Sequence, residues 1–337
     1  MKTIVLGIET SCDETAAAVV SDDRTILSNV VFSQIDDHKP YGGVIPELSA
    51  RQHLHLLPKV IDQALSQGGV ALEEVTAIAA TGGPGLIGGV IVGVMMAKSM
   101  AFHQKKPFIA VNHLEGHALT ARLTHDVSFP FMLLLVSGGH TQIIHVSGVG
   151  QYHLLGTTLD DAVGETFDKV AKMLGLSYPG GPALERYAEG GDATAIAFPK
   201  PLFHRPDCQL SFSGLKTAVR VELEKNLNQG SLYKKNVAAS FQETVSQVLL
   251  KKLENALGLY PNTKNIVVAG GVAANKRIRQ GLETIAEKNN KKLFLPPISL
   301  CTDNAAMIAW AGTERFKMGH TSSFDFAPRP RWPLSDL

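Results

Sequence analysis

Two histidines four residues apart form the pattern in this sequence that most directly suggests chemistry. They are His113 and His117, in the segment His-Leu-Glu-Gly-His. If the segment is helical, both imidazoles lie on one face and can bind a single metal ion. The alternative is two partly exposed histidines among the twelve of the chain. Glu115 does not directly follow the first histidine, as the general base of a zinc protease would, so peptidase chemistry loses its main support.

A third metal ligand is available in the segment Cys301-Thr-Asp-Asn304. Asp303 precedes an alanine-rich helical pattern, where its carboxylate could either bind the metal or simply serve as the helix N-cap. From the residues alone the two interpretations are equally supported. Two histidines and one aspartate would leave coordination positions open for a substrate, as a catalytic metal requires.

Further carboxylates are grouped near two predicted turns. Asp13 and Glu14 lie in a hairpin near the N-terminus, where they are suited to orient an amine or to hold a cation, and we take them as candidate catalytic residues. Asp160 and Asp161 stand at a predicted helix start, where the helix dipole accounts for both. Asp168 follows two turns later and is either a solvated surface residue or an acceptor for ribose hydroxyls.

Paired glycines could let backbone N–H groups approach a nucleotide. Ser137-Gly-Gly-His-Thr141 lies between two predicted strands, and Gly270-Gly271 lies between a strand and a helix beginning near Asn275, whose amide could reach a ribose or base. Each turn alone is ordinary turn chemistry, but their recurrence favours a phosphate-bearing ligand. The letters of Gly83-Pro-Gly-Leu-Ile-Gly88 match a dinucleotide fingerprint, yet the acidic residue that would hold the ribose is missing. The sequence also has no P-loop.

The elements that position these residues occur twice in the same order. Ile4–Val20 and Phe131–Val146 each predict a strand, a polar turn and a second strand. Val75–Thr81 and Asn265–Ala269 each predict a strand followed by two glycines and a helix. This repetition predicts a duplicated α/β fold of two lobes with a central cleft. We place the lobes at 1–127 and 128–337 and expect the last helix, about 303–317, to return onto the first lobe.

Apolar spacing at three and four residues predicts the remaining helices. They are Glu47–Leu65 with an interruption at Pro58, Leu86–His103, Asp160–Leu174, Gly214–Leu227, Lys234–Leu257, Asn275–Lys288 and Asp303–Lys317.

The composition is that of an ordinary globular protein of about two domains. Its 337 residues include 32 Lys and Arg against 31 Asp and Glu, so the net charge of +1 supplies no global field toward nucleic acid. The three cysteines are too few for a disulfide framework and fit a reducing compartment. The apolar start is cut short by Glu9, and the uncharged stretch Val75–Ala97 is broken by glycines, so we expect a cytoplasmic protein without a membrane span.

Taken together, these motifs resemble the bacterial TsaD family. The segments that carry the resemblance are Gly7–Thr15, Tyr41–Arg51, Gly83–Leu86, Asn112–His117, Leu135–Thr141, Tyr178–Pro182, Phe212–Thr217 and Arg329–Trp332. Members of this family are tRNA N6-adenosine threonylcarbamoyltransferases, formerly described as O-sialoglycoprotein endopeptidases. The resemblance covers nearly the whole chain and implies the duplicated actin-like ATPase fold of Hsp70 and sugar kinases.

The resemblance also implies the roles of individual residues. His113, His117 and Asp303 match the metal ligands, for which iron or zinc is the usual ion. The residues that match positions holding the adenylate substrate are Leu135, Val136, Ser137, Gly138, Gly139, Asp168, Gly181 and Asn275, and Glu185 falls where the family often has an acid. The family moves the threonylcarbamoyl group from threonylcarbamoyl-AMP to N6 of the adenosine at tRNA position 37, in tRNAs reading codons that begin with adenine. AMP is the second product.

The same resemblance implies partners: tRNA, the helper proteins TsaB and TsaE, and a TsaC-type enzyme that supplies the adenylate. The basic residues do not form one stripe, which favours help in binding tRNA. They occur at Lys234-Lys235, Lys251-Lys252, Lys276 to Arg279, Lys291-Lys292, and Arg329 with Arg331. Two alternatives remain from the residues: a kinase or ATPase of the same fold, and a non-catalytic nucleotide-binding scaffold, which would not need the histidine pair.

Overall fold

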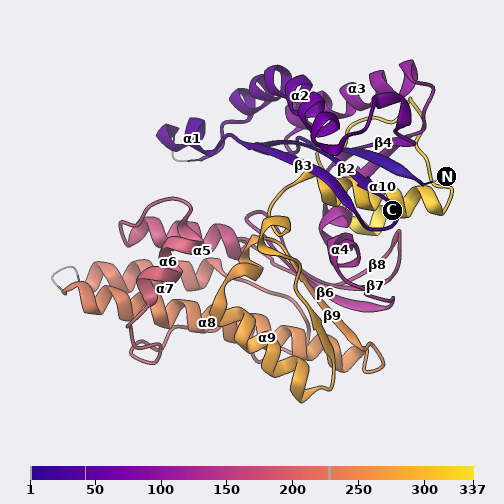
Figure 1. The fold of residues 1–337 in the computed structure, drawn as a ribbon. Helices are drawn as coiled ribbons and strands as arrows, with labels where there is room; N and C mark the ends of the chain where they lie inside the picture. Colours follow the sequence, from indigo (N-terminus) through magenta and orange to yellow (C-terminus); the bar gives the residue numbers. More distant parts are fainter. Residues whose placement is uncertain (1, 42, 227–228) are drawn as a thin grey trace. The chain divides into compact units, whose positions relative to one another are not determined.

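The computed structural model describes residues 2–41, 43–226 and 229–337, and the chain forms two compact units (Figure 1). Unit 1 runs from the N-terminus to Asp126 and adds Val149–Gln151 and Thr302–Leu337. Unit 2 consists of Val127–Gly148 and Tyr152–Cys301. Gly42, within one of the family segments, and Leu227, the predicted end of a helix, lie outside the described residues. The assignment of the two lobes to residues 1–127 and 128–337 stays a prediction.

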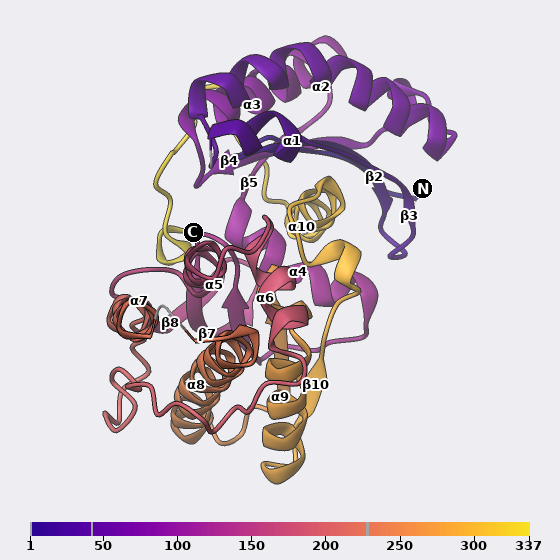
Figure 2. The ribbon, with the colours of Figure 1, turned by 90° about the vertical axis from the view of Figure 1, so that its left-hand side faces the viewer.

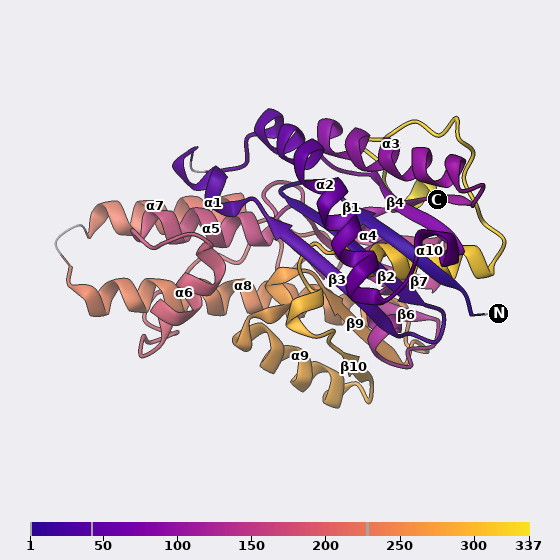
Figure 3. The same ribbon diagram turned by 45° about the horizontal axis from the view of Figure 1, so that its top comes forward.

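Unit 1 is built on a mixed five-stranded sheet in the order β3-β2-β1-β4-β5. The strands are β1 (Ile4–Glu9), β2 (Glu14–Ser21), β3 (Ile26–Ser33), β4 (Ala77–Gly83) and β5 (Phe108–Asn112). β1 pairs antiparallel with β2 and parallel with β4. Alternate strand residues such as Leu6 and Ile8 pack on the helices α2 (Pro46–Gly68) and α3 (Ile87–His103), which cover one face (Figure 3).

The other face of this sheet is covered by α10 (Ala305–Lys317), which packs against α4 (His113–Thr124) (Figure 2). Gly7 makes the close approach of α10 feasible, because a Cβ there would lie 2.5 Å from the carbonyl oxygen of Ala305. The chain therefore returns at its C-terminal end to the sheet with which it began. The short helix α1 (Ile35–His38) precedes α2.

Unit 2 repeats this plan with the sheet order β10-β9-β6-β7-β8. The strands are β6 (Phe131–Val136), β7 (Thr141–Gly148), β8 (Gln151–Thr157), β9 (Asn265–Ala269) and β10 (Lys292–Phe294). Its helices are α5 (Val163–Met173), α6 (Gly180–Ala188), α7 (Ser213–Lys225), α8 (Ser231–Leu259) and α9 (Lys276–Lys288), and α5 to α8 gather together in Figure 1. In each unit an antiparallel hairpin leads and parallel strands follow, so the predicted duplicated α/β fold is confirmed.

Several helix boundaries differ from the prediction. The α2 helix continues through Pro58, because the buried residues Leu57 and Ile61 on both sides of the exposed proline hold it to the sheet. The α5 helix begins at Val163 rather than Asp160, and α10 begins at Ala305 rather than Asp303. In both places the predicted first residues make contacts of their own, described below.

In the described part of the chain, no helix is both long and apolar enough to cross a bilayer. The uncharged stretch Val75–Ala97 contains β4, a turn and the first part of α3.

Candidate metal centre and nucleotide site

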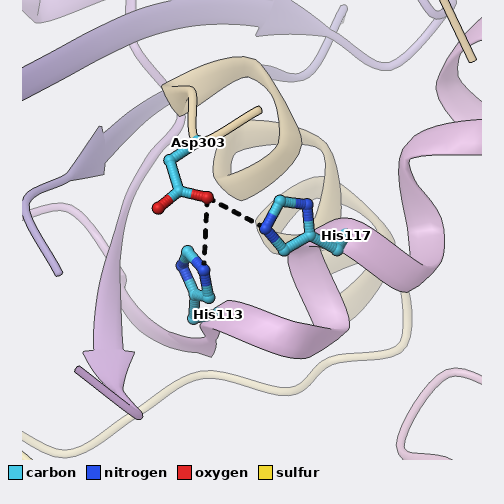
Figure 4. Close-up of side chains that lie close together, drawn as sticks. All are labelled: His113, His117 and Asp303. Atoms are coloured by element: carbon cyan, nitrogen blue, oxygen red, sulfur yellow. Dashed lines mark hydrogen bonds and ion pairs between the residues drawn. The ribbon is translucent and has the colours of Figure 1, made fainter. Parts of the chain in front are cut away.

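The three predicted ligands converge in unit 1, although Asp303 lies 186 residues after His117. The Nε2 atom of His117 is 3.1 Å from Asp303 Oδ1, and the Nε2 atom of His113 is 3.5 Å from the same oxygen (Figure 4). The prediction of a helix across the histidine pair is confirmed, since α4 begins at His113. The side chain of Asn112 caps this helix by accepting hydrogen bonds from the amides of Leu114 and Glu115.

Two alternatives from the sequence are wrong. Asp303 is not the N-cap of α10, because the Asn304 side chain takes that role and accepts from the amide of Met307 at 3.1 Å. The carboxylate of Asp303 is thereby left to face the histidines. The histidines are also not partly exposed, since His113 and His117 are 7% and 2% exposed.

The electrostatics of this cluster are those of mutually stabilising charges. Burial lowers the pKa of His113, but the carboxylates of Asp303 and Glu9 outweigh it and raise this pKa well above its ordinary value. Burial would raise the pKa of Asp303, yet His113 and His117 hold it well below its usual range. Two imidazole nitrogens and a carboxylate oxygen within 4.8 Å of one another suit a borderline divalent ion such as iron or zinc.

Glu9, at the end of β1, also belongs to this cluster, although the sequence motifs did not indicate it as a site residue. Its Oε2 atom lies 3.0 Å from the Nδ1 atom of His113. A signal was present in the sequence, because a carboxylate interrupts the apolar run of a buried strand.

The acidic pair of the first hairpin lies near the same cluster. Burial, followed by the charges of Asp303 and Asp13, raises the pKa of Glu14 to about 9. The hairpin is held from α2, where the buried His53 contacts Thr15 Oγ1 at 2.8 Å through Nδ1 and the carbonyl of Cys12 at 3.0 Å through Nε2. The structure thus brings Glu14 into the electrostatic surroundings of Asp303, with Asp13 beside Glu14.

In unit 2, the turn after β6 has open space beside two of its glycines. A Cβ on Gly138 or Gly139 would meet no atom within 4 Å. The amide of Gly164, in the first turn of α5, donates to the carbonyl of Ser137 at 3.2 Å. Gly270, with φ of 95°, packs so closely on the turn that a Cβ would lie 2.3 Å from the carbonyl oxygen of Val136. The two predicted glycine turns and the start of α5 therefore lie together.

Four further predicted substrate residues, Asp168, Gly181, Glu185 and Asn275, lie on α6, contact it or lie next to a residue that contacts it. Asp168 accepts a hydrogen bond from the amide of Gly180 at 2.8 Å, beside Gly181, and its burial raises its pKa although these amides oppose the change. Glu185 accepts from the amide of Lys276 at 2.7 Å. Asn275 caps α9 by accepting from the amide of Ile278, and its amide group donates to Gln242 at 2.8 Å. The Asn275 side chain is thus engaged in holding its own helix.

Leu135 and Val136 are placed differently from the other predicted substrate residues. Both side chains are fully buried in β6, where Leu135 pairs with Gln142 and Ala269 on the neighbouring strands. Their side chains support the sheet below the turn, so they would contact a ligand only through their backbone, and their role in substrate binding stays a prediction.

Asp160 and Asp161 do not serve the dipole of α5 as predicted, because they precede its first turn. Asp160 accepts from the amides of Phe212 and Ser213 at 2.8 and 3.2 Å, and Asp161 forms an ion pair with Lys216. These contacts hold the start of α7 against the segment before α5.

Comparisons with known proteins agree with this architecture. The TsaD family model, described as tRNA N6-adenosine threonylcarbamoyltransferase, matches residues 25–310. Proteins of that name from Paramagnetospirillum magneticum and Rhodospirillum rubrum are each 55% identical to this chain; the matches cover 98% of it and 97% and 94% of those proteins.

Two solved structures show the same fold at 14% identity. HypF of T. kodakarensis has a TM-score of 0.64 over 94% of this chain and 48% of its own. Component A of the (R)-2-hydroxyglutaryl-CoA dehydratase of Acidaminococcus fermentans has a TM-score of 0.52 over 94% and 99%. The fold is the duplicated actin-like ATPase fold, and the chain belongs to the TsaD family of tRNA N6-adenosine threonylcarbamoyltransferases.

Proposed function

We propose that this chain transfers a threonylcarbamoyl group from threonylcarbamoyl-AMP to N6 of the adenosine at position 37 of tRNAs that read codons beginning with adenine. The observation that carries the proposal is 55% identity to threonylcarbamoyltransferases along nearly the whole chain. A kinase or ATPase would need an aspartate near the hairpin Ser137–Thr141, which has none. A non-catalytic scaffold would not need the buried histidine pair.

His113, His117 and Asp303 are the residues that would hold a divalent metal ion, with iron and zinc as the ions that suit these donors. Such an ion would act as a Lewis acid toward the carbonyl of the threonylcarbamoyl group. The convergence of both Nε2 atoms on one carboxylate oxygen supports this assignment.

The residues of unit 2 are assigned to the adenylate. The amides of Gly138 and Gly139 can approach its phosphate, because no Cβ stands in the way. Asp168 and Glu185 are suited to accept hydrogen bonds from ribose hydroxyls or the base. These contacts bind and orient the donor.

The acceptor is an exocyclic adenine amine, a weak nucleophile, so its positioning must supply much of the acceleration. We assign Asp13 and Glu14 to orient this amine. In the reaction a bond forms between N6 and the carbamoyl carbon, the bond from that carbon to the AMP oxygen breaks, and the proton that leaves N6 passes to the departing AMP phosphate. The adenosine lies in a single-stranded loop, from which it can be turned out at modest cost.

The proposed function includes the partners TsaB and TsaE, and a TsaC-type enzyme that makes the adenylate from threonine, bicarbonate and ATP. It also places the chain in the cytoplasm.

Mass spectrometry of tRNA tests the activity. Purified chain and partners, incubated with threonine, bicarbonate, ATP and unmodified tRNA, should add the threonylcarbamoyl mass at the adenosine beside the anticodon. His113→Ala or Asp303→Asn should slow transfer at least about 100-fold, because electrophile activation is worth several kcal/mol. His103→Ala, at the exposed end of α3, is the matched control and should leave the rate unchanged. Undiminished transfer by His113→Ala without metal would exclude the metal's role.

A further inference from the structure

Glu9 is a charged residue in an environment that normally excludes charge. It ends β1, its exposure is 0%, and the neighbouring strand residue Ile8 belongs to the apolar core of unit 1. Among the described residues, no lysine or arginine nitrogen lies within 4.0 Å of its carboxylate. Burying a carboxylate costs free energy of folding unless hydrogen bonds and an opposite charge compensate for the lost water. The contacts of Glu9 therefore indicate its role.

Both carboxylate oxygens of Glu9 are fixed by donors. Oε1 accepts from the amide of Ser11, and Oε2 accepts from the hydroxyl of Thr81 on β4. Oε2 is also 3.0 Å from Nδ1 of His113. The first of these contacts comes from the turn after β1 and the second from β4. Together they hold the carboxylate still, so its contact with Nδ1 holds the imidazole ring in one orientation.

This arrangement determines which ring nitrogen can bind a metal. An ionised carboxylate is an acceptor and has no proton to give, whereas the Ser11 hydroxyl, 3.2 Å from the same nitrogen, can accept as well as donate. The nearer contact to Glu9 therefore favours the ring form in which Nδ1 of His113 carries the hydrogen. In the neutral ring the lone pair then lies on Nε2, the nitrogen that faces Asp303 Oδ1 at 3.5 Å. Ligand histidines are usually held in this way by a carboxylate or carbonyl on the nitrogen that does not bind the metal.

We propose that Glu9 is a positioning residue that holds His113 in the tautomer with hydrogen on Nδ1 and so assigns Nε2 as its metal-binding atom. This inference rests on the metal site of the proposed function. His117 provides the contrast, because its Nδ1 is buried and has no hydrogen-bond partner in the described structure. Of the two histidines, His113 is the one that is anchored to the sheet through its second ring nitrogen, by the contact of Nδ1 with Glu9.

The test compares the Zn²⁺ affinity of the wild-type full chain with that of the Glu9→Gln variant. Both affinities are measured by competition with a chromophoric chelator. Glu9→Gln keeps the shape of the side chain, but its amide can donate to Nδ1 and so shift the ring hydrogen to Nε2. We expect Zn²⁺ binding to weaken about 10- to 100-fold. Glu243→Gln, the same change at a carboxylate paired with Arg277 in unit 2, is the matched control and should bind Zn²⁺ like the wild type.

A second readout needs no change at Glu9. In Zn²⁺-loaded wild type labelled with ¹⁵N-histidine, His113 should show a protonated Nδ1 and a metal-bound Nε2. Thr81→Val removes one support of the carboxylate and leaves the charge in place, so it should weaken Zn²⁺ binding several-fold. This variant and the spectrum decide the matter if Glu9→Gln does not fold.

The outcomes separate the two proposals. If wild type binds no Zn²⁺, the metal site itself is wrong. If wild type binds Zn²⁺ and a folded Glu9→Gln protein binds it equally well, or if Nδ1 of His113 is the metal-bound nitrogen, Glu9 does not have this role.

Discussion

At the residue scale, some glycines of unit 2 are needed for folding and others are free to serve ligand binding. Substitutions by alanine distinguish the two groups. We predict that Gly138→Ala and Gly139→Ala leave the free energy of unfolding nearly unchanged, because the new methyl group meets no atom within 4 Å. The same methyl group would stand between the turn and a phosphate, so adenylate binding should weaken at least about 10-fold. Urea unfolding and calorimetric titration with an adenylate analogue measure the two effects.

Gly270→Ala is the control for these variants. Its Cβ would lie 2.3 Å from the carbonyl oxygen of Val136, at a φ that favours glycine, so we expect a large loss of stability. If Gly138→Ala and Gly139→Ala both bound the analogue as tightly as wild type, the turn would not be a phosphate site.

Asp160 provides a pH-dependent contribution to stability. Burial would raise its pKa, but hydrogen bonds from Ser211, Phe212 and Ser213 outweigh it and lower the pKa to about 2. Between about pH 4 and pH 2 the unfolded chain therefore binds more protons at this position than the folded one, and stability falls as pH falls. Above that range the contribution is fully present.

We predict that Asp160→Asn costs about 1 kcal/mol at pH 7, a value discounted for the exposure of the group. The deficit should shrink as the pH is lowered from 4 toward 2. Urea unfolding between pH 7 and pH 3 measures it, with Asp325→Asn, on the exposed C-terminal segment, as the control. A deficit that stayed constant over this range would show that the charge of Asp160 is unimportant.

At the element scale, two ion pairs connect α4, which carries the two histidines, with α10, which begins two residues after Asp303. Glu115, between the two histidines of α4, pairs with Arg315 of α10 and also accepts from the amide of Gly150 at 3.2 Å. About two turns along α4, Arg122 pairs with Glu314 at 2.7 Å. Because Asp303 immediately precedes α10, these pairs help to set its distance from the histidines.

We predict that Arg315→Met destabilises unit 1 by about 3–5 kcal/mol, because the fully buried Glu115 would lose its ion pair with Arg315. Zn²⁺ binding should weaken as well. Adding Glu115→Gln should recover much of the stability. The control is Arg24→Met, whose partner Asp126 is 94% exposed, and it should cost at most about 1 kcal/mol. Equal unfolding midpoints for the two single variants would contradict this account.

At the scale of the whole molecule, the charges provide no net positive field toward tRNA. The net charge is +1, and several of the predicted basic spots are occupied within the protein. Lys252 is fully buried and donates to the carbonyls of Arg205 and Asp207. Arg277 pairs with Glu243, and Lys291 donates to the carbonyl of Pro261.

We therefore predict that the chain alone binds tRNA weakly and does not sustain full multiple turnover. Adding the helper proteins should tighten binding and make its dependence on salt steeper, since more phosphates would be neutralised. Fluorescence anisotropy with an anticodon stem-loop at several salt concentrations, together with turnover assays, measures this. Full multiple turnover by the purified chain alone would show that the helpers are not required.

The sequence by itself determined the features that depend on neighbours along the chain. The apolar periods placed most strands and helices, and the spacing of His113 and His117 placed both on one helical turn, because each is a matter of local geometry. Local pattern also predicted the duplication, since the same order of elements occurs twice.

Only the tertiary structure decided which residues meet across long stretches of chain. It brought Asp303 to a histidine 186 residues away and Glu9 to one 104 residues away. It also gave the capping role to Asn304 and buried Lys252. The physical reason is that such contacts depend on the packing of whole helices and sheets, and no spacing along the sequence encodes the distance between their ends.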